Sequence, residues 1–251
     1  MDGPKVSFLI AGVQKGGTTA LFDYLVDHPA LELPAIKEAH FFDDDRNVDW
    51  RAPDHGRYHA LFSRSAPVVR GEATPIYIYW PNCLERIAAY NPAMRLILLF
   101  RDPVERAWSH WRMERARGAE ENPFAWCIRE GRARVDDPQA PGYHREYSYV
   151  ERGFYGAQLA KLYTIFPHQQ VLPLTSEALD ADPDGVLARV TAFLDVPGFP
   201  GPIRPRRSHV GLETGRDEPP TAEDIALLRG IYAADQALFR DLRGDGAAGS
   251  T

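Results

Sequence analysis

Short apolar runs along the chain predict the strands of a buried parallel sheet. The clearest run spans residues 95–100, and other runs cover 5–11 and 170–174; the segment 68–72 is interpreted as a further strand. Their apolar residues are mostly continuous rather than alternating with polar ones, as in strands that are covered on both faces. A sheet of this kind needs helices on both sides.

Apolar residues at helical spacing predict those helices. They are expected over residues 20–28, from 103 onward, and over 81–90, 155–166, 184–194 and 221–242. The alternation of strand and helix predicts an α/β fold with a central parallel sheet flanked by helices. We expect a single domain over residues 5–243 and a disordered tail over 244–251.

Two of these helices carry recognisable start signals. Asp102 can cap a helix, Pro103 suits the first helical position, and Glu105 stands where a capping-box acid belongs. Thr221 and Asp224 have the spacing of a second capping box. Both helices are therefore expected to begin at these residues.

Three irregular stretches separate the predicted elements. Residues 31–67 are rich in aromatic and acidic side chains, 129–152 are charged, and 197–220 are dense in Pro, Gly and Arg. Loops carry much of the binding function of α/β proteins. We expect an acceptor to meet the loops at 43–67 and 129–152, the latter with the side chains Tyr143, His144, Tyr147 and Tyr149.

Composition narrows the class of protein. The chain has 251 residues, of which 44% are hydrophobic and 25% charged, and its formal net charge of −6 weighs against a general nucleic-acid or anionic-membrane binder. We expect no membrane span and no signal peptide, since the apolar runs are short and the N-terminus lacks a basic region. Cys83 and Cys127 are too few for a disulfide framework, which predicts buried free thiols and a cytoplasmic location.

A glycine-rich turn between the first strand and the first helix predicts an anion site. Gly16 and Gly17 allow the backbone to approach an anion closely, and the helix N-terminus adds partial positive charge. Thr18 and Thr19 add hydroxyl donors, and Lys15 adds a full positive charge. A glycine turn with no ligand is the alternative.

The turn departs from the Walker A motif, G-x-x-x-x-G-K-[ST], in the position of its lysine. Thr18 stands where that lysine belongs, and Lys15 precedes it by three residues. The strand over 95–100 also leads into Arg101 rather than into the Asp that holds Mg²⁺ in many NTPases. Together these differences favour a metal-free site for a phosphate-rich ligand.

Several motifs together resemble the sulfotransferases that use 3′-phosphoadenosine 5′-phosphosulfate (PAPS). They are K-G-G-T-T over residues 15–19, R-D-P-V-E-R-A-W-S over 101–109, and shorter segments at 71–75 and 153–155 followed by Leu159. K-E-A-H-F-F over 37–42 is similar to the K-E-x-H-F-F segment of the heparan-sulfate-type branch. The resemblance implies the P-loop-like sulfotransferase fold.

It also implies transfer of a sulfuryl group from PAPS to a hydroxyl or amine of a carbohydrate or small-molecule acceptor. Lys15 would stabilise the leaving group, because a cation aimed at the bridging oxygen favours the transition state. Arg101 and Ser109 would hold the 3′-phosphate. Tyr155 either contacts the nucleotide or packs. Heparan-type relatives carry a basic K-G-R segment that closes over the donor, where this chain reads R-R-S-H. Arg206 and Arg207 would thus bind the donor, or they form an exposed basic loop.

Glu38 is the candidate general base, and we expect burial to raise its pKa toward the working pH. If residues 34–42 are extended, His40 faces the same way and is a second base, an acceptor contact or a packed side chain. Glu72 and Thr74 could line the acceptor pocket or cap a turn. Residues 43–45 are interpreted as a solvated acidic turn rather than a metal site, and Arg106 is expected to pair with acids on the surface.

Two other functions remain open. A P-loop kinase acting on a small metabolite would need ATP and Mg²⁺, and the displaced lysine argues against it. A non-catalytic nucleotide-binding module would keep the turn at 12–19 but would not need Glu38. The sequence leaves open the identity of the acceptor, the choice between oxygen and nitrogen, and the oligomeric state.

Overall fold

In the computed structural model, residues 5–63, 68–136, 141–201 and 218–244 are described. The chain divides into two compact units, Met1–Phe100 with Tyr163–Ser208, and Arg101–Leu162 with His209–Thr251. The first contains the sheet, and the second is helical among its described residues. The single domain over residues 5–243 stays a prediction.

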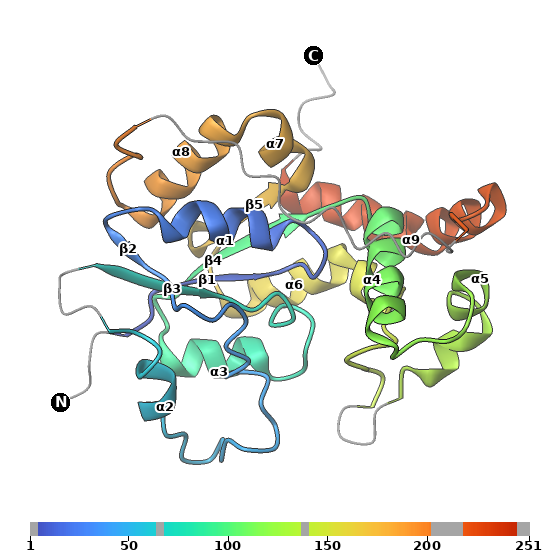
Figure 1. Cartoon of the computed structure of the whole chain (residues 1–251), viewed down its shortest axis with the longest axis horizontal. Helices are drawn as coiled ribbons and strands as arrows, with labels where there is room; N and C mark the ends of the chain where they lie inside the picture. The colour runs from blue at the N-terminus through green and yellow to red at the C-terminus, as the bar shows by residue number, and fades with distance from the viewer. Residues whose placement is uncertain (1–4, 64–67, 137–140, 202–217, 245–251) are drawn as a thin grey trace. The chain divides into compact units, whose positions relative to one another are not determined.

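A five-stranded parallel sheet forms the centre of the first unit (Figure 1). Its strands run in the order β2-β3-β1-β4-β5. They are β1 (Phe8–Gly12), β2 (Leu31–Glu32), β3 (Val69–Ala73), β4 (Arg95–Phe100) and β5 (Val171–Thr175). Each neighbouring pair is parallel, so that the carboxyl ends of the strands meet at one edge of the sheet. The predicted α/β class and parallel sheet are confirmed.

Helices cover both faces of this sheet. Figure 1 shows α1 (Thr18–Val26), α7 (Ser176–Ala181) and α8 (Pro183–Leu194) on one face, and α3 (Cys83–Tyr90) on the other. The short helix α2 (Gly56–His59) lies in the loop between β2 and β3.

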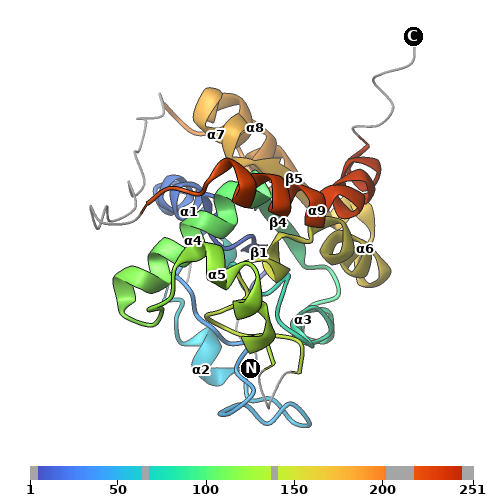
Figure 2. The same ribbon diagram turned by 90° about the vertical axis from the view of Figure 1, so that its right-hand side faces the viewer.

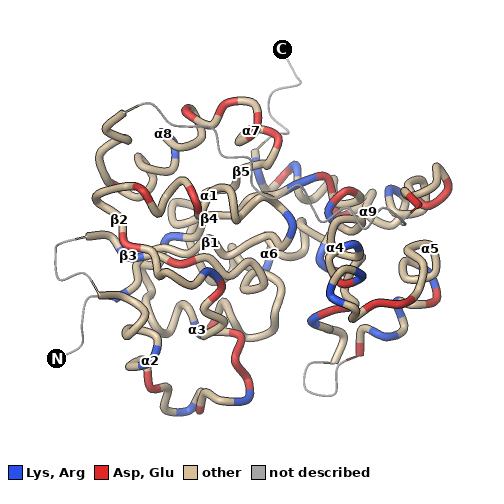
Figure 3. Tube along the Cα trace, in the orientation of Figure 1, with Lys and Arg blue, Asp and Glu red and all other residues tan. Residues whose placement is uncertain are grey.

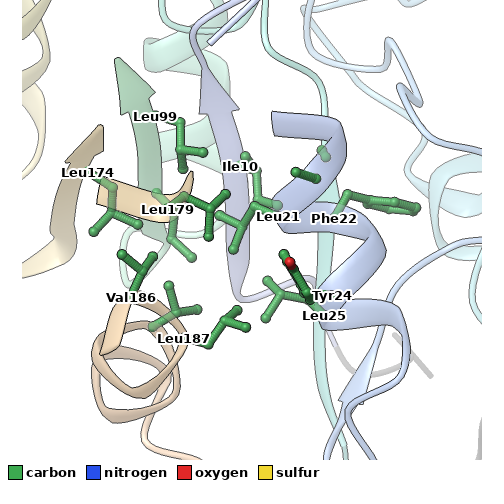
Figure 4. Close-up of a cluster of buried hydrophobic side chains, with 14 of the residues drawn as sticks. Ile10, Leu21, Phe22, Tyr24, Leu25, Leu99, Leu174, Leu179, Val186 and Leu187 are labelled. Carbon is green, nitrogen blue, oxygen red and sulfur yellow. The ribbon is translucent and has the colours of Figure 1, made fainter. Parts of the chain in front are cut away.

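Apolar side chains from the sheet, α1, α7 and α8 form the main core of the first unit. Figure 4 shows Leu21 and Leu25 of α1 in one cluster with Ile10 and Leu99 of the central strands. All four are fully buried. Burial of each such aliphatic side chain stabilises the fold by roughly 1.5–3 kcal/mol. This core holds the end of β1 and the start of α1 in a fixed relation.

The second unit has its own apolar cluster. It contains α4 (Pro103–Arg117), α5 (Phe124–Cys127), α9 (Ala222–Arg243) and most of α6 (Tyr155–Ile165). Side chains of α4, α5 and α9 pack together. Figure 2 shows these three helices next to one another. The rings of Trp108 and Trp111 are stacked at 4.8 Å beside Phe124.

Both predicted helix starts are present. The Asp102 carboxylate accepts hydrogen bonds from the backbone N–H groups of Val104 and Glu105, at 2.9 and 3.0 Å, and Pro103 follows it. Thr221 and Asp224 form the expected capping box. Glu105, however, pairs its side chain with Arg101 at 2.8 Å instead of reaching back to the cap.

Other expectations need correction. The helix predicted from residue 81 begins at Cys83, with Asn82 as its left-handed cap. The stretch over 129–152 contains the 3₁₀ turns Glu130–Arg134 and Glu151–Gly153, and it buries Tyr149 completely. A fully exposed loop would leave such a ring in water, whereas here it packs in the core of the second unit.

Charges of both signs are interspersed along the described chain (Figure 3). Cys83 and Cys127 are buried free thiols, as predicted. Within the described residues, no helix combines the length and the apolar character needed to cross a bilayer. The predicted tail beyond Gly244 lies outside the described residues, as do Arg206 and Arg207.

Candidate active site

The glycine-rich turn connects β1 to α1 at the carboxyl edge of the sheet. Val13 N donates to Leu99 O of β4 at 2.9 Å, and Gly16 N donates back to Val13 O at 2.9 Å. A Cβ atom on Gly16 would lie 2.2 Å from Leu99 O, which is impossible without moving backbone. Glycine is therefore required here to let the turn pass close to β4.

The turn ends at Gly17, which has a φ of 91° and stands at the N-cap of α1. Gly17 has no side chain to cap the helix, and no acid stands in the first turn of α1. Unpaired N–H groups and the dipole at such a helix start favour an anion. Thr18 is buried and Thr19 half-buried, while Lys15 is half-buried with a φ of 68°.

The segment with Glu38 is anchored to the neighbouring strand end. Glu38 N donates to Ala73 O, the last residue of β3, at 2.9 Å. Ala73 is paired with Ile10 of β1, and the glycine turn follows β1. The structure thus brings the candidate base and the candidate anion site to the carboxyl ends of adjacent strands. The segment is not extended as expected, because Glu38 and His40 have φ values of 66° and 50°.

Glu38 lies between two cationic side chains. Its carboxylate is 2.5 Å from Lys37 Nζ and 3.5 Å from His40 Nε2. Burial alone would raise the pKa of Glu38, but the hydrogen bond with His40 and the charge of Lys37 outweigh it and lower the pKa to about 2. The expectation of a raised pKa is therefore wrong, and Glu38 is ionised at neutral pH.

His40 is held on its other side by Asp43, 2.9 Å from its Nδ1. The hydrogen bonds with Asp43 and Glu38 raise the pKa of His40 to about 9, although burial opposes them. His40 is therefore a cation at neutral pH. Its side chain is 48% exposed, so that it is not the packed histidine left open by the sequence.

A raised carboxyl pKa occurs instead at Glu72, near the end of β3. Its side chain is fully buried, and this burial raises the pKa of Glu72 to about 7. Thr74 Oγ1 donates to Glu72 Oε2 at 2.7 Å. A carboxyl inside a buried strand that pairs with β1 was the signal that could have identified it.

The acidic side chains that follow Phe42 form ion pairs within the protein. Asp43 is buried, Asp44 pairs with Arg57 at 2.7 Å, and Asp45 pairs with Arg86 at 2.6 Å. The interpretation as a solvated turn is therefore wrong for Asp43, whereas Asp44 is half-buried and Asp45 exposed. In the described part of the chain, no three His, Cys, Asp or Glu side chains gather as a metal site would require.

The predicted 3′-phosphate residues belong to the second unit. Arg101 follows β4 directly, and its side chain is 35% exposed and paired with Glu105. Ser109 is half-buried on α4. Lys15 lies in the other unit. It therefore stays a prediction that Lys15 and Arg101 hold opposite ends of one nucleotide.

Three further side chains of the second unit are buried. Tyr155 packs against Phe239 with ring centroids 5.4 Å apart, so its packing is established and its contact with a nucleotide stays a prediction. Tyr149 is fully buried and cannot face an acceptor from this position. Arg106 is also fully buried and donates to Tyr149 O, which corrects the expectation of a surface ion pair.

Comparison with known proteins identifies the family. The model of the sulfotransferase domain matches residues 5–226. Mouse heparan sulfate glucosamine 3-O-sulfotransferase 6 is 30% identical over 94% of this chain and 71% of its own length. The human protein of the same name is 33% identical, and the match covers 74% of this chain and 51% of that protein.

A solved structure is similar over nearly its whole length. It is a sulfotransferase from Alicyclobacillus acidocaldarius, with a TM-score of 0.78 and 25% identity over 96% of both chains. The expected fold, the resemblance and the transferase class are confirmed. The chain belongs to the sulfotransferase domain family.

Proposed function

We propose that this chain transfers a sulfuryl group from PAPS to a hydroxyl group of a carbohydrate. The observation that carries the proposal is the placement of two features on adjacent strand ends. The glycine turn with Lys15 follows β1, and the turn with Glu38 is hydrogen-bonded to the end of β3. A phosphate-rich donor and an acceptor hydroxyl need such neighbouring sites.

Each side chain has a defined task in this reaction. The hydroxyl oxygen forms a new bond to sulfur, while the bond from sulfur to the oxygen of the 5′-phosphate breaks. Lys15 and the N–H groups at the start of α1 stabilise the charge that develops on that leaving oxygen. Glu38 takes the proton of the acceptor hydroxyl.

The ion pairs of Glu38 define how it acts. It is already ionised at neutral pH, so that it is ready to accept a proton, but Lys37 and His40 make it a weak base. An arriving hydroxyl therefore donates to a carboxylate that cations already orient. The two N–H groups of the cationic His40 face Asp43 and Glu38, so His40 acts on an anionic sulfuryl group through its charge.

The names of the relatives support a sugar hydroxyl as the acceptor. The mouse and human proteins are glucosamine 3-O-sulfotransferases of heparan sulfate. The chain spans about half the length of the human protein. The proposal of a sugar acceptor therefore rests on similarity to part of that protein. Mass spectrometry of a sulfated glucosamine oligosaccharide would distinguish O- from N-sulfation.

A transfer assay with PAPS labelled in the sulfuryl group tests the proposal. The protein is incubated with glucosamine oligosaccharides, with and without Mg²⁺, and Glu38→Gln is compared with the wild type. We expect metal-independent transfer that Glu38→Gln abolishes, with nearly unchanged affinity for the donor. A matched control is Glu32→Gln, because Glu32 is a buried carboxylate paired with Arg70 outside the site.

The other outcomes identify the alternatives. Turnover that requires ATP and Mg²⁺ would show a kinase. Donor binding without turnover on any acceptor would show a nucleotide-binding module. A large loss of donor affinity in Glu38→Gln would make Glu38 a structural residue.

We also propose a reducing, cytoplasmic location. The two buried free thiols, Cys83 and Cys127, support it, because oxidising compartments favour paired cysteines. Fractionation of the native host cells with an antibody to this chain tests it.

A further inference from the structure

Two hydroxyl groups that follow β3 hold the turn of the candidate base. His40 N donates to Thr74 Oγ1 at 3.5 Å. The backbone N–H groups of Phe41 and Phe42 donate to the Tyr77 hydroxyl at 3.0 and 3.4 Å. Three consecutive N–H groups of the turn are therefore satisfied by side chains of one neighbouring segment.

The Thr74 hydroxyl is in turn bonded to Glu72, because Thr74 Oγ1 donates to Glu72 Oε2 at 2.7 Å. The Tyr58 hydroxyl of α2 donates to the other oxygen, Glu72 Oε1, at 3.5 Å. A hydroxyl has one hydrogen to donate and two lone pairs that accept. When the Thr74 hydrogen points to Glu72, the lone pairs of Thr74 Oγ1 remain for the His40 N–H. Glu72 thereby sets the direction of this hydrogen bond.

The turn needs this support because its backbone is unfavourable. Glu38 and His40 both have positive φ, which side-chain-bearing residues rarely adopt. A backbone of this kind persists only where its surroundings fix it. The hydrogen bonds to Ala73, Thr74 and Tyr77 provide that fixation from one segment.

We infer that Glu72 is a positioning residue for sulfuryl transfer. From the core it orients the Thr74 hydroxyl, and Thr74 together with Tyr77 fixes the turn that presents Glu38 and His40. Glu72 has no exposed surface, so it acts through other groups and not on a substrate. The inference rests on the proposed role of Glu38 in catalysis.

The charge of Glu72 controls this arrangement. The groups that face it are Thr74, Tyr77, Tyr58 of α2, His40 and Asp43. Burial and the charge of Asp43 raise the pKa of Glu72, whereas the hydrogen bond with Thr74 and the charge of His40 lower it. The resulting pKa is about 7. Above about pH 7 the carboxylate accepts from the Thr74 and Tyr58 hydroxyls. Below it, the carboxyl group is neutral and these hydrogen bonds weaken, because they are no longer charge-assisted.

Amide hydrogen exchange tests the structural half of the inference without any substrate. The variants are Glu72→Gln, Thr74→Val and the conservative Thr74→Ser, with Glu32→Gln as the control. We expect exchange at residues 40–42 to become roughly tenfold faster or more in the first two, since a bond to an ionised group is lost or reversed. Thr74→Ser should restore slow exchange, and Glu32→Gln should leave it unchanged.

Kinetics test the functional half. We expect Glu72→Gln to lower kcat by about 10²-fold, the scale of a misplaced catalytic group, with little change in KM for PAPS. In the wild type, kcat should fall as pH drops below about 7, and this fall should be absent in Glu72→Gln. A residue that only stabilises the fold, such as Glu32, would lower the unfolding temperature without altering this pH profile.

The results separate the two proposals. Unchanged exchange at residues 40–42 in both Glu72→Gln and Thr74→Val would overturn the inference, as would a pH profile of Glu72→Gln identical to that of the wild type. Absence of any transfer by the wild-type chain would instead refute the proposed function. Amide exchange would still decide whether Glu72 fixes the turn. Thr74→Val provides this answer if Glu72→Gln fails to fold.

Discussion

Replacing Arg134 by Met is expected to destabilise the second unit by about 3 kcal/mol. Arg134 donates to both oxygens of the Glu120 carboxylate, at 3.2 and 2.6 Å, and the Glu120 side chain is fully buried. The Tyr149 hydroxyl donates to the same carboxylate at 2.9 Å. Met keeps the apolar length of the side chain but removes the charge, which leaves Glu120 in the core without this cation.

The magnitude follows from the pKa of Glu120. Burial would raise it, but the hydrogen bonds from Arg134 and the Asn122 backbone lower it from 4.5 to about 2. One pKa unit corresponds to ~1.4 kcal/mol, so this displacement corresponds to ~3 kcal/mol. Because the folded-state pKa is lower than the unfolded one, the stabilisation is complete above about pH 4.5 and is lost as pH falls through about 2. At pH 3, roughly 2 kcal/mol of it is gone.

Unfolding in urea at pH 7 and at pH 3 measures the effect. The difference in free energy of unfolding between wild type and Arg134→Met should be ~3 kcal/mol at pH 7 and ~1 kcal/mol at pH 3. Arg57→Met is the control, since Arg57 pairs with Asp44 through a half-exposed side chain and should cost about 1 kcal/mol or less. Equal stabilities of the two variants at pH 7, or a difference that persists unchanged at pH 3, would refute the reasoning.

Three further predictions concern the candidate site. Lys15→Ala should lower kcat by roughly 10²–10³-fold in the labelled-PAPS assay, and unchanged turnover would exclude Lys15 from the chemistry. Gly16→Ala should abolish the calorimetric heat of binding adenosine 3′,5′-bisphosphate, because its Cβ would meet Leu99 O at 2.2 Å; wild-type binding would contradict this. Asp43→Asn should shift the NMR-observed pKa of His40 from about 9 toward 6.5, and an unshifted titration would show that Asp43 is not the cause.

The elements defined by local signals could be predicted from the sequence. The strand at residues 95–100 is a continuous apolar run, and α9 begins at a capping box that its own residues specify. The helices α5 and α7 are too short to show a clear period. The burial of Tyr149 and Arg106 depends on packing partners far along the chain, which periodicity does not reveal.

The same distinction holds for the site. The glycine turn is a local feature, and its required glycines are visible in the sequence. The low pKa of Glu38 could not be predicted from the sequence, because it depends on a positive-φ turn that brings Lys37 and His40 to the carboxylate. Glu72 belongs to a motif that the sequence shows, but Tyr58 and the turn after Glu38 are brought near it by the fold.

The placement of the cysteines offers a way to time local opening. The chain has two, and each compact unit holds one, Cys83 in the first and Cys127 in the second. Both sulfur atoms are inaccessible in the folded chain, so a thiol-modifying reagent can react only after its unit opens. Single-cysteine variants would report the opening of each unit separately. Their modification rates, measured by mass spectrometry, would show whether the two units open together or independently.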